Sequence, residues 1–174
     1  MHDWNLTNFP YINSWTLMAE AFEAAYKAVE SELGRHDTTL AQFNMLLILD
    51  LSKTSLTPGQ IASYTFREQH SVSAQLSRMR RAGLITKTRS RKDQRVVTVR
   101  ITPKGKELLE RVKPVGLGLA RNLLQSCFSQ KQLEQFDQNM KKVRDCALQL
   151  LGKEVKPLPP NFRIPETLAE CGLT

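Results

Sequence analysis

Basic side chains that could neutralise phosphates are concentrated in one segment of this 174-residue chain. Residues 78–113 contain thirteen Lys or Arg side chains and three acidic ones, so this segment carries a net charge of +10, whereas the rest of the chain carries −2. Such a concentration is typical of a protein that binds a polyanion, above all nucleic acid. A solvated basic face is the alternative, and the charge alone does not choose between the two.

The sequence contains no residue pattern that indicates catalysis or metal binding. The three histidines lie far apart, and the three cysteines, which are separated by 19 and 25 residues, match no zinc-binding spacing. These residues are His2, His36, His70, Cys127, Cys146 and Cys171. Neither a G-x-S-x-G nucleophile elbow nor a glycine-rich phosphate loop is present. We therefore expect a protein that is not an enzyme and that needs no metal or other cofactor.

The composition is that of an ordinary globular chain, with 41% hydrophobic and 24% charged residues. The uncharged, largely apolar segment at residues 38–49 is much shorter than the ~20 apolar residues of a membrane-spanning helix. The N-terminus does not resemble a signal peptide, and the few cysteines fit a reducing compartment. We expect a cytoplasmic protein with no membrane partner.

Apolar periodicity and capping residues predict four helices in the first half of the chain. Apolar side chains at steps of three and four residues predict a long helix over residues 11–34. Residues 40–51 are apolar nearly all round, which is typical of a core helix. Residues 57–60, Thr-Pro-Gly-Gln, predict the capped start of a short third helix. A fourth helix is predicted from about residue 70 to 82, and Gly83 ends it.

The fourth helix combines an apolar stripe with a small, polar outer face. Val72, Leu76 and Met79 form the stripe that is predicted to be buried. The residues assigned to the opposite, exposed face are His70, Ser71, Ser73, Ala74, Gln75, Ser77, Arg78 and Arg81. A helix of this kind can dock on its own domain while its outer face approaches the edges of bases, because the major groove of DNA, ~12 Å wide, admits one helix.

A basic β-hairpin is predicted directly after this helix. Residues 84–89 and 95–101 are rich in β-forming residues. Arg91 and Lys92 in the connection, with Arg95 at the start of the second run, give the hairpin a basic tip that can contact the DNA backbone or enter a minor groove. The order of elements is that of a winged helix-turn-helix.

Two further helices are predicted in the second half of the chain. Thr102 and Pro103 open a helix that reaches about Cys127, with a kink or break expected at Pro114. A possible second capping box, Ser129-x-x-Gln132, opens a helix that ends at about residue 151. The apolar residues of this last helix follow a heptad-like seam: Leu133, Phe136, Met140, Val143, Ala147 and Leu150. The seam could close a bundle within the chain, but a subunit interface is the stronger interpretation.

Between residues 40 and 105 the chain resembles the MarR family of dimeric bacterial and archaeal transcription regulators. The resemblance depends on five short matches: Leu40-x-Gln42-Phe43-x-x-Leu46, Ser71-Val72-Ser73, Arg78-Met79-x-x-x-Gly83-Leu84-Ile85, Asp93-x-Arg95 and Ile101-Thr102-x-x-Gly105. It implies a mainly α-helical fold with a small β-hairpin, in which a winged helix-turn-helix over residues 38–101 is flanked by dimerisation helices at 11–34 and 102–151. The proline-rich tail, 153–174, lies outside the resemblance.

The resemblance implies a homodimer that binds double-stranded DNA at an inverted repeat, most simply as a repressor. Together with the predicted faces it assigns DNA contact to ten residues: His70, Ser71, Ser73, Gln75, Arg78, Arg81, Arg89, Arg91, Lys92 and Arg95. Asp93 would brace the wing. Many family members carry an arginine where this chain has Ala74, which leaves the preferred operator open.

Regulation by a small aromatic or anionic effector is also implied only by the resemblance. Trp15, His36 and Tyr64 are the candidates to border a cleft for it, although a place in the core or on the surface is the stronger interpretation of each. A protein-interaction module on a winged-helix scaffold is the alternative function, which the acidic N-terminal third permits. The +10 charge over the fourth helix and the hairpin favours DNA.

Overall fold

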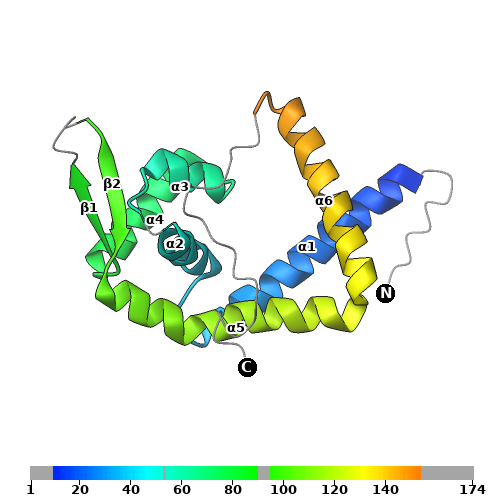
Figure 1. The fold of residues 1–174 in the computed structure, drawn as a ribbon, viewed down its shortest axis with the longest axis horizontal. Coiled ribbons are helices and arrows are strands. Elements are labelled where there is room, and N and C mark those ends of the chain that lie inside the picture. The colour runs from blue at the N-terminus through cyan, green and yellow to red at the C-terminus, as the bar shows by residue number, and fades with distance from the viewer. Residues whose placement is uncertain (1–9, 53, 90–94, 154–174) are drawn as a thin grey trace.

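The computed structural model describes residues 10–52, 54–89 and 95–153 of the chain. The elements in these ranges follow the predicted order (Figure 1). They are α1 (Pro10–Gly34), α2 (Leu40–Leu51), α3 (Pro58–Tyr64), α4 (Gln69–Arg81), β1 (Ile85–Arg89), β2 (Val97–Ile101), α5 (Pro103–Cys127) and α6 (Gln130–Leu150). The tail from residue 154 onward, which contains Cys171, lies outside the described residues.

One lobe contains α2, α3, α4 and the hairpin, and the long helices α1, α5 and α6 extend away from it (Figure 1). The core of the lobe is a single cluster in which Met45, Leu46 and Ile61 are fully buried. The C-terminal part of α1 and the first half of α5 complete this cluster with Leu33, Leu109 and Val112. The lobe is therefore rigidly connected to the two helices that flank it in sequence.

Side-chain caps set the starts of the helices. The Thr57 hydroxyl accepts from the Gln60 backbone N–H at 3.2 Å, and Gln60 Oε1 accepts from the Thr57 N–H at 2.8 Å, so the predicted capping box is confirmed. At α2, Thr39 accepts from the Gln42 N–H. Glu30 of α1 adds its carboxylate there, since its Oε2 accepts from the Leu40 N–H at 2.6 Å. This last bond links α1 to the lobe.

The end of α4 and the start of β1 share a glycine turn. Gly83 has φ +74°, its N–H donates to the Arg80 carbonyl at 3.0 Å, and the Leu84 N–H donates to the Met79 carbonyl at 3.0 Å. This pair of bonds is a Schellman motif, in which the left-handed residue is usually glycine. Because it uses the Leu84 N–H, β1 begins one residue later than predicted.

Thr102 joins the hairpin to α5 and closes the same turn. Its hydroxyl donates to the Gly83 carbonyl at 2.7 Å and accepts from the Gly105 N–H at 3.0 Å, while its own N–H donates to the Leu84 carbonyl. Gly105 lies so close to Leu84 that a Cβ atom on it would stand 2.1 Å from the Leu84 carbonyl oxygen. The Ile-Thr-x-x-Gly motif therefore fixes the wing against α4 and α5.

The hairpin has one face toward the core and one toward solvent. The antiparallel register pairs Ile85 with Ile101 and Lys87 with Val99. Directly paired residues share a face, and Ile85 and Val99 are buried. Lys87 therefore lies on the same face of the hairpin as Ile85 and Val99, but nearer the tip than Ile85, so this face changes from apolar to basic along β1.

The α5 helix is continuous from Pro103 to Cys127, so the break considered at Pro114 does not occur. Within the described ranges, none of the helices combines the length and the apolar composition needed to cross a bilayer.

Candidate nucleic-acid interface

The α4 helix presents the predicted apolar stripe to the core and a polar face outward. Val72, Leu76 and Met79 are fully buried. Seven of the eight residues assigned to its outer face are exposed: His70, Ser71, Ser73, Ala74, Ser77, Arg78 and Arg81. The outer face thus carries small hydroxyl and methyl groups near the N-terminal half of the helix and arginines near its C-terminal end.

Gln75 does not lie on the outer face, and this part of the prediction is wrong. Its side chain is only 9% exposed. Its Oε1 accepts from Arg78 Nε at 3.0 Å and from Arg78 Nη2 at 2.6 Å. Gln75 stands one residue before Leu76 and three after Val72, so the buried stripe is wide enough to include it. Arg78 remains exposed and has one edge of its guanidinium occupied by this amide.

The turn between α3 and α4 is tied to the long first helix. The turn contains Phe66, a bulky residue with φ +52° and a largely exposed side chain. Next to it, Arg67 Nη2 donates to the phenol oxygen of Tyr26 in α1 at 2.7 Å. Together with the bond between Glu30 and Leu40, this contact fixes the helix-turn-helix relative to α1.

Exposed arginines stand on both sides of the connection between β1 and β2. Arg89 closes β1, and Arg95 precedes β2. The tip residues assigned to DNA contact and wing bracing, Arg91, Lys92 and Asp93, lie outside the described residues.

A basic hollow lies between α4 and β1. We call it the α4–β1 notch; its volume is about 410 Å³, and it is lined by Ser77, Arg80, Arg81 and Lys87. Three cationic side chains and a hydroxyl around one hollow form a suitable site for a phosphate group. Arg80 and Lys87 were not among the predicted contact residues. Their positive charge was visible in the sequence, but only the packing of α4 against β1 brings them together.

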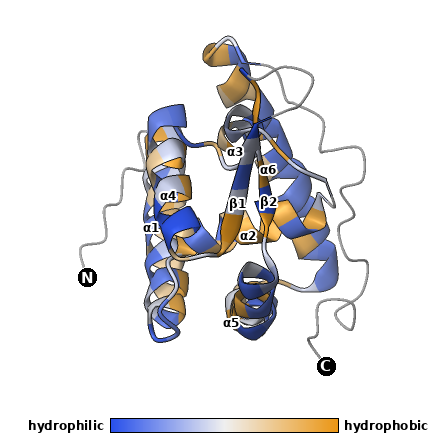
Figure 2. Ribbon diagram, turned by 90° about the vertical axis from the view of Figure 1, so that its left-hand side faces the viewer, coloured by the Kyte–Doolittle hydropathy of each residue, from blue (hydrophilic) through white to orange (hydrophobic). Residues whose placement is uncertain are grey.

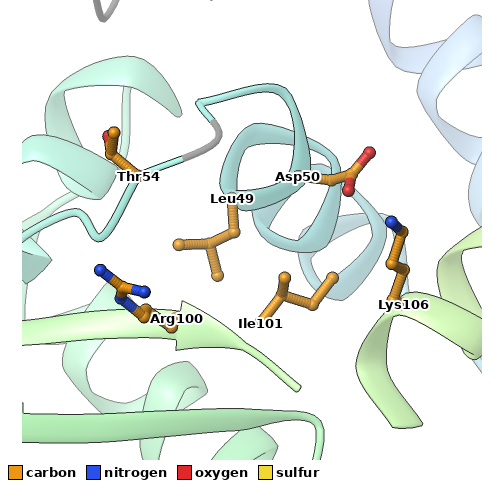
Figure 3. A pocket seen from close by; sticks show the side chains of 6 residues that line it. All are labelled: Leu49, Asp50, Thr54, Arg100, Ile101 and Lys106. Atoms are coloured by element: carbon orange, nitrogen blue, oxygen red, sulfur yellow. The ribbon is translucent and has the colours of Figure 1, made fainter. Parts of the chain in front are cut away.

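A second hollow of about 200 Å³ lies between the end of α2, β2 and the start of α5. Its lining is Leu49, Asp50, Thr54, Arg100, Ile101 and Lys106 (Figure 3). Apolar side chains lie at its centre, and Asp50 and Lys106 stand on one side of them (Figure 3). The mixture of charges makes this hollow a poorer site for an anion than the α4–β1 notch.

The three residues suggested for an effector cleft are not gathered at one place in the chain. Trp15 is 68% exposed in the N-terminal half of α1, while His36 follows the C-terminal end of that helix. The helix between them separates the two residues by about 30 Å at 1.5 Å per residue. Tyr64 packs at the edge of the core, and none of the three lines either hollow.

The amino-acid sequence is similar to those of known transcriptional regulators over the helix-turn-helix and the first part of the hairpin. The sequence model described as the MarR family matches residues 36–96. The HTH-type transcriptional regulator TtmR of Methylorubrum extorquens (strain PA1) is 31% identical over 90 residues, which are 52% of this chain and 44% of that relative. The match thus spans less than half the length of the curated relative.

Solved structures show the same fold over a larger part of the chain. The organohalide-sensing regulator RdhR in its 2,4-dichlorophenol-bound form has a TM-score of 0.78 at 21% identity, covering 94% of this chain and 96% of that one. The MepR–DNA complex of S. aureus has a TM-score of 0.67 at 24% identity, covering 74% of this chain and 93% of that one. The predicted mainly α-helical, winged helix-turn-helix fold is confirmed.

Proposed function

We propose that this chain, whose residues 36–96 match the sequence model of the MarR family, is a sequence-specific DNA-binding transcription regulator that acts as a homodimeric repressor. The observation that carries the proposal is the composition of one surface. The exposed face of α4, the α4–β1 notch and the arginines of the hairpin are all polar or basic. A helix of this kind fits the major groove, and the flanking cations fit the backbone phosphates.

The homodimer is supported by apolar surface that one copy leaves uncovered. Trp15 and Phe22 on α1 are largely exposed, although Tyr26 and Val29 further along the same helix pack against the core. On α6, Leu150 is 89% exposed, and Val143 on the same helix is also exposed. The α1 and α6 helices lie apart in Figure 2, so the exposed apolar faces of these two helices do not cover each other within one copy. A second copy of the chain is the occupant that we propose for both faces.

A symmetric dimer places two α4 helices on one face of a DNA duplex. Because the subunits are related by a two-fold axis, we propose an inverted-repeat operator whose half-sites lie one helical turn, ~34 Å, apart. The MepR structure contains DNA, which is a property of that protein and supports the same mode here. A cytoplasmic location belongs to the same proposal.

Release by a small aromatic or anionic effector is a further part of the proposal. Its support is the RdhR structure, which contains 2,4-dichlorophenol. Since Trp15 and His36 stand at opposite ends of α1, a cleft that includes both residues requires Trp15 from a second copy of the chain. The effector cleft proposed here therefore lies between subunits.

Neutralising the α4–β1 notch tests the DNA interface. The double substitution Arg80→Gln and Lys87→Gln is expected to lower affinity for all duplexes to a similar degree. Each lost phosphate contact is expected to reduce the slope of log K against log salt by about 1. Fluorescence anisotropy at several salt concentrations, with a duplex selected by the wild-type chain from a randomised library, measures both quantities.

The matched control removes the same charge from α6. Lys131→Gln together with Lys141→Gln changes two exposed bases outside the proposed interface. This variant should keep the wild-type slope to within experimental error. Equal slopes for the notch variant and the wild type would remove Arg80 and Lys87 from the interface, and a protein that binds no duplex at low salt would favour the protein-interaction module.

A further inference from the structure

We propose that Gln75 is a positioning residue that holds the guanidinium of Arg78 for contact with a guanine of the operator. The inference rests on the proposed function and deepens it, because it names one residue that reads a base and another that orients it. Gln75 itself is buried and does not touch DNA in this account.

The geometry of the pair fixes the guanidinium plane. Arg78 Nε and Nη2 both donate to the same oxygen, Gln75 Oε1, at 3.0 and 2.6 Å. These hydrogen bonds have a charged donor and are stronger than neutral ones. Gln75 flanks the buried stripe of the same helix and is itself only 9% exposed, which limits the movement of its amide. An exposed arginine thereby loses the freedom to rotate about its long side chain.

The bonds to Gln75 leave the other edge of the guanidinium available. A guanidinium has five N–H donors, and this pair uses one on Nε and one on Nη2. The remaining edge, formed by Nη1 and Nη2, is a planar fork of parallel donors. Such a fork matches the O6 and N7 acceptors of guanine in the major groove, which is the most frequent specific contact made by arginine.

A fixed orientation favours a base over a phosphate as the target. Phosphate oxygens accept hydrogen bonds from many directions, so a mobile lysine or arginine serves as well there. Guanine presents its two acceptors in one plane and at one spacing, and a guanidinium that is already oriented loses less conformational entropy on binding. The amide at position 75 is buried, and the hydrogen bonds that its oxygen accepts come from Arg78.

A protein–DNA double-mutant cycle with the full chain tests the inference. The probe is the duplex that the wild-type chain selects from a randomised library, with each guanine replaced in turn by 7-deazaguanine, which lacks the N7 acceptor. The wild type should lose affinity by about tenfold at one guanine in each half-site. Arg78→Ala and Gln75→Met should each abolish the difference between the two duplexes, and the double variant should bind no more weakly than Arg78→Ala alone.

Rescue by a residue that keeps the acceptor separates positioning from packing. Gln75→Glu retains an oxygen for Arg78 and should retain the preference for guanine, whereas Gln75→Met keeps the shape and loses the oxygen. Unfolding midpoints of all variants show whether a loss of binding reflects a loss of fold.

Three results would overturn the inference. In the first, Gln75→Met still discriminates guanine from 7-deazaguanine as the wild type does. In the second, the effects of Gln75→Met and Arg78→Ala are additive. In the third, Arg78→Ala still discriminates guanine from 7-deazaguanine. This third result requires only a substitution of the exposed Arg78, so it can be obtained even if Gln75→Met fails to fold. If any of these results is found and the wild-type chain still selects a sequence from the library, the role of Gln75 is wrong and the proposed function stands. If the wild-type chain selects no sequence, both the role of Gln75 and the proposed function are contradicted.

Discussion

Substitution of Trp15 by Asp is expected to convert the proposed dimer into monomers and to weaken operator binding by ~100-fold or more. Trp15 lies on the apolar face of α1 and is 68% exposed in a single copy. Burying a carboxylate in a subunit interface without a partner carries a large desolvation cost. A monomer then binds each half-site alone and loses the high effective concentration that the second half-site has for a linked subunit.

Ala24→Asp is the matched control, because it places the same charge at another exposed position of the same helix. Analytical ultracentrifugation gives the mass of each variant, and anisotropy with full-site and half-site duplexes gives the affinities. The Trp15 variant should sediment as a monomer and bind both duplexes with similar, weak affinity. A Trp15→Asp protein that remains dimeric with the affinity of the wild type would exclude this face of α1 from the interface.

Gly105→Ala is expected to destabilise the protein by about 3 kcal/mol, the upper part of the range for overpacking a close contact. A Cβ atom at this position would lie 2.1 Å from the carbonyl oxygen of Leu84 and 3.0 Å from Ile101 Cγ1. The first obstacle is backbone, and it belongs to the turn that Thr102 and Gly83 lock. The start of α5 must therefore move away from the wing, and the locked turn resists this movement.

Gly59→Ala in α3 serves as the control, since the nearest atom to its added Cβ would be the Thr57 hydroxyl at 3.9 Å. Helix propensity alone makes Ala better than Gly by roughly 1 kcal/mol in either helix. The changes in the free energy of unfolding caused by the two substitutions, measured by urea unfolding, should therefore have opposite signs or differ by several kcal/mol. Similar free energies of unfolding for both variants would show that the contact between Gly105 and Leu84 is not tight in solution.

Several helix ends could be predicted because they depend on local chemistry, whereas both strands begin one or two residues later than predicted. Thr57, Thr102 and Ser129 begin helices at the predicted positions, since a hydroxyl before a helix has a defined hydrogen-bonding role. Gly83 ends α4 because the left-handed conformation favours glycine. These features depend on a few neighbouring residues, which the sequence shows directly.

Features that depend on packing could not be predicted in the same way. The width of the buried stripe on α4 is set by the elements packed around it, so the periodicity that identified Val72 and Leu76 could not decide the side of Gln75. Arg80 and Lys87 come together only because β1 lies against α4. At Pro114 the loss of one backbone hydrogen bond favoured a break, but packing of α5 against α1 and α2 on both sides of it keeps the helix continuous.

Sequence-selective binding of duplex DNA is measured by the ratio of the affinities for two duplexes. Fluorescence anisotropy of the full chain should be measured with its library-selected duplex and with a scrambled duplex of the same composition, at low and at moderate salt. We expect a preference of ~1000-fold or more for the selected duplex and a steep loss of affinity for both duplexes as salt rises. Equal affinity for the two duplexes, or no binding at low salt, would contradict this expectation.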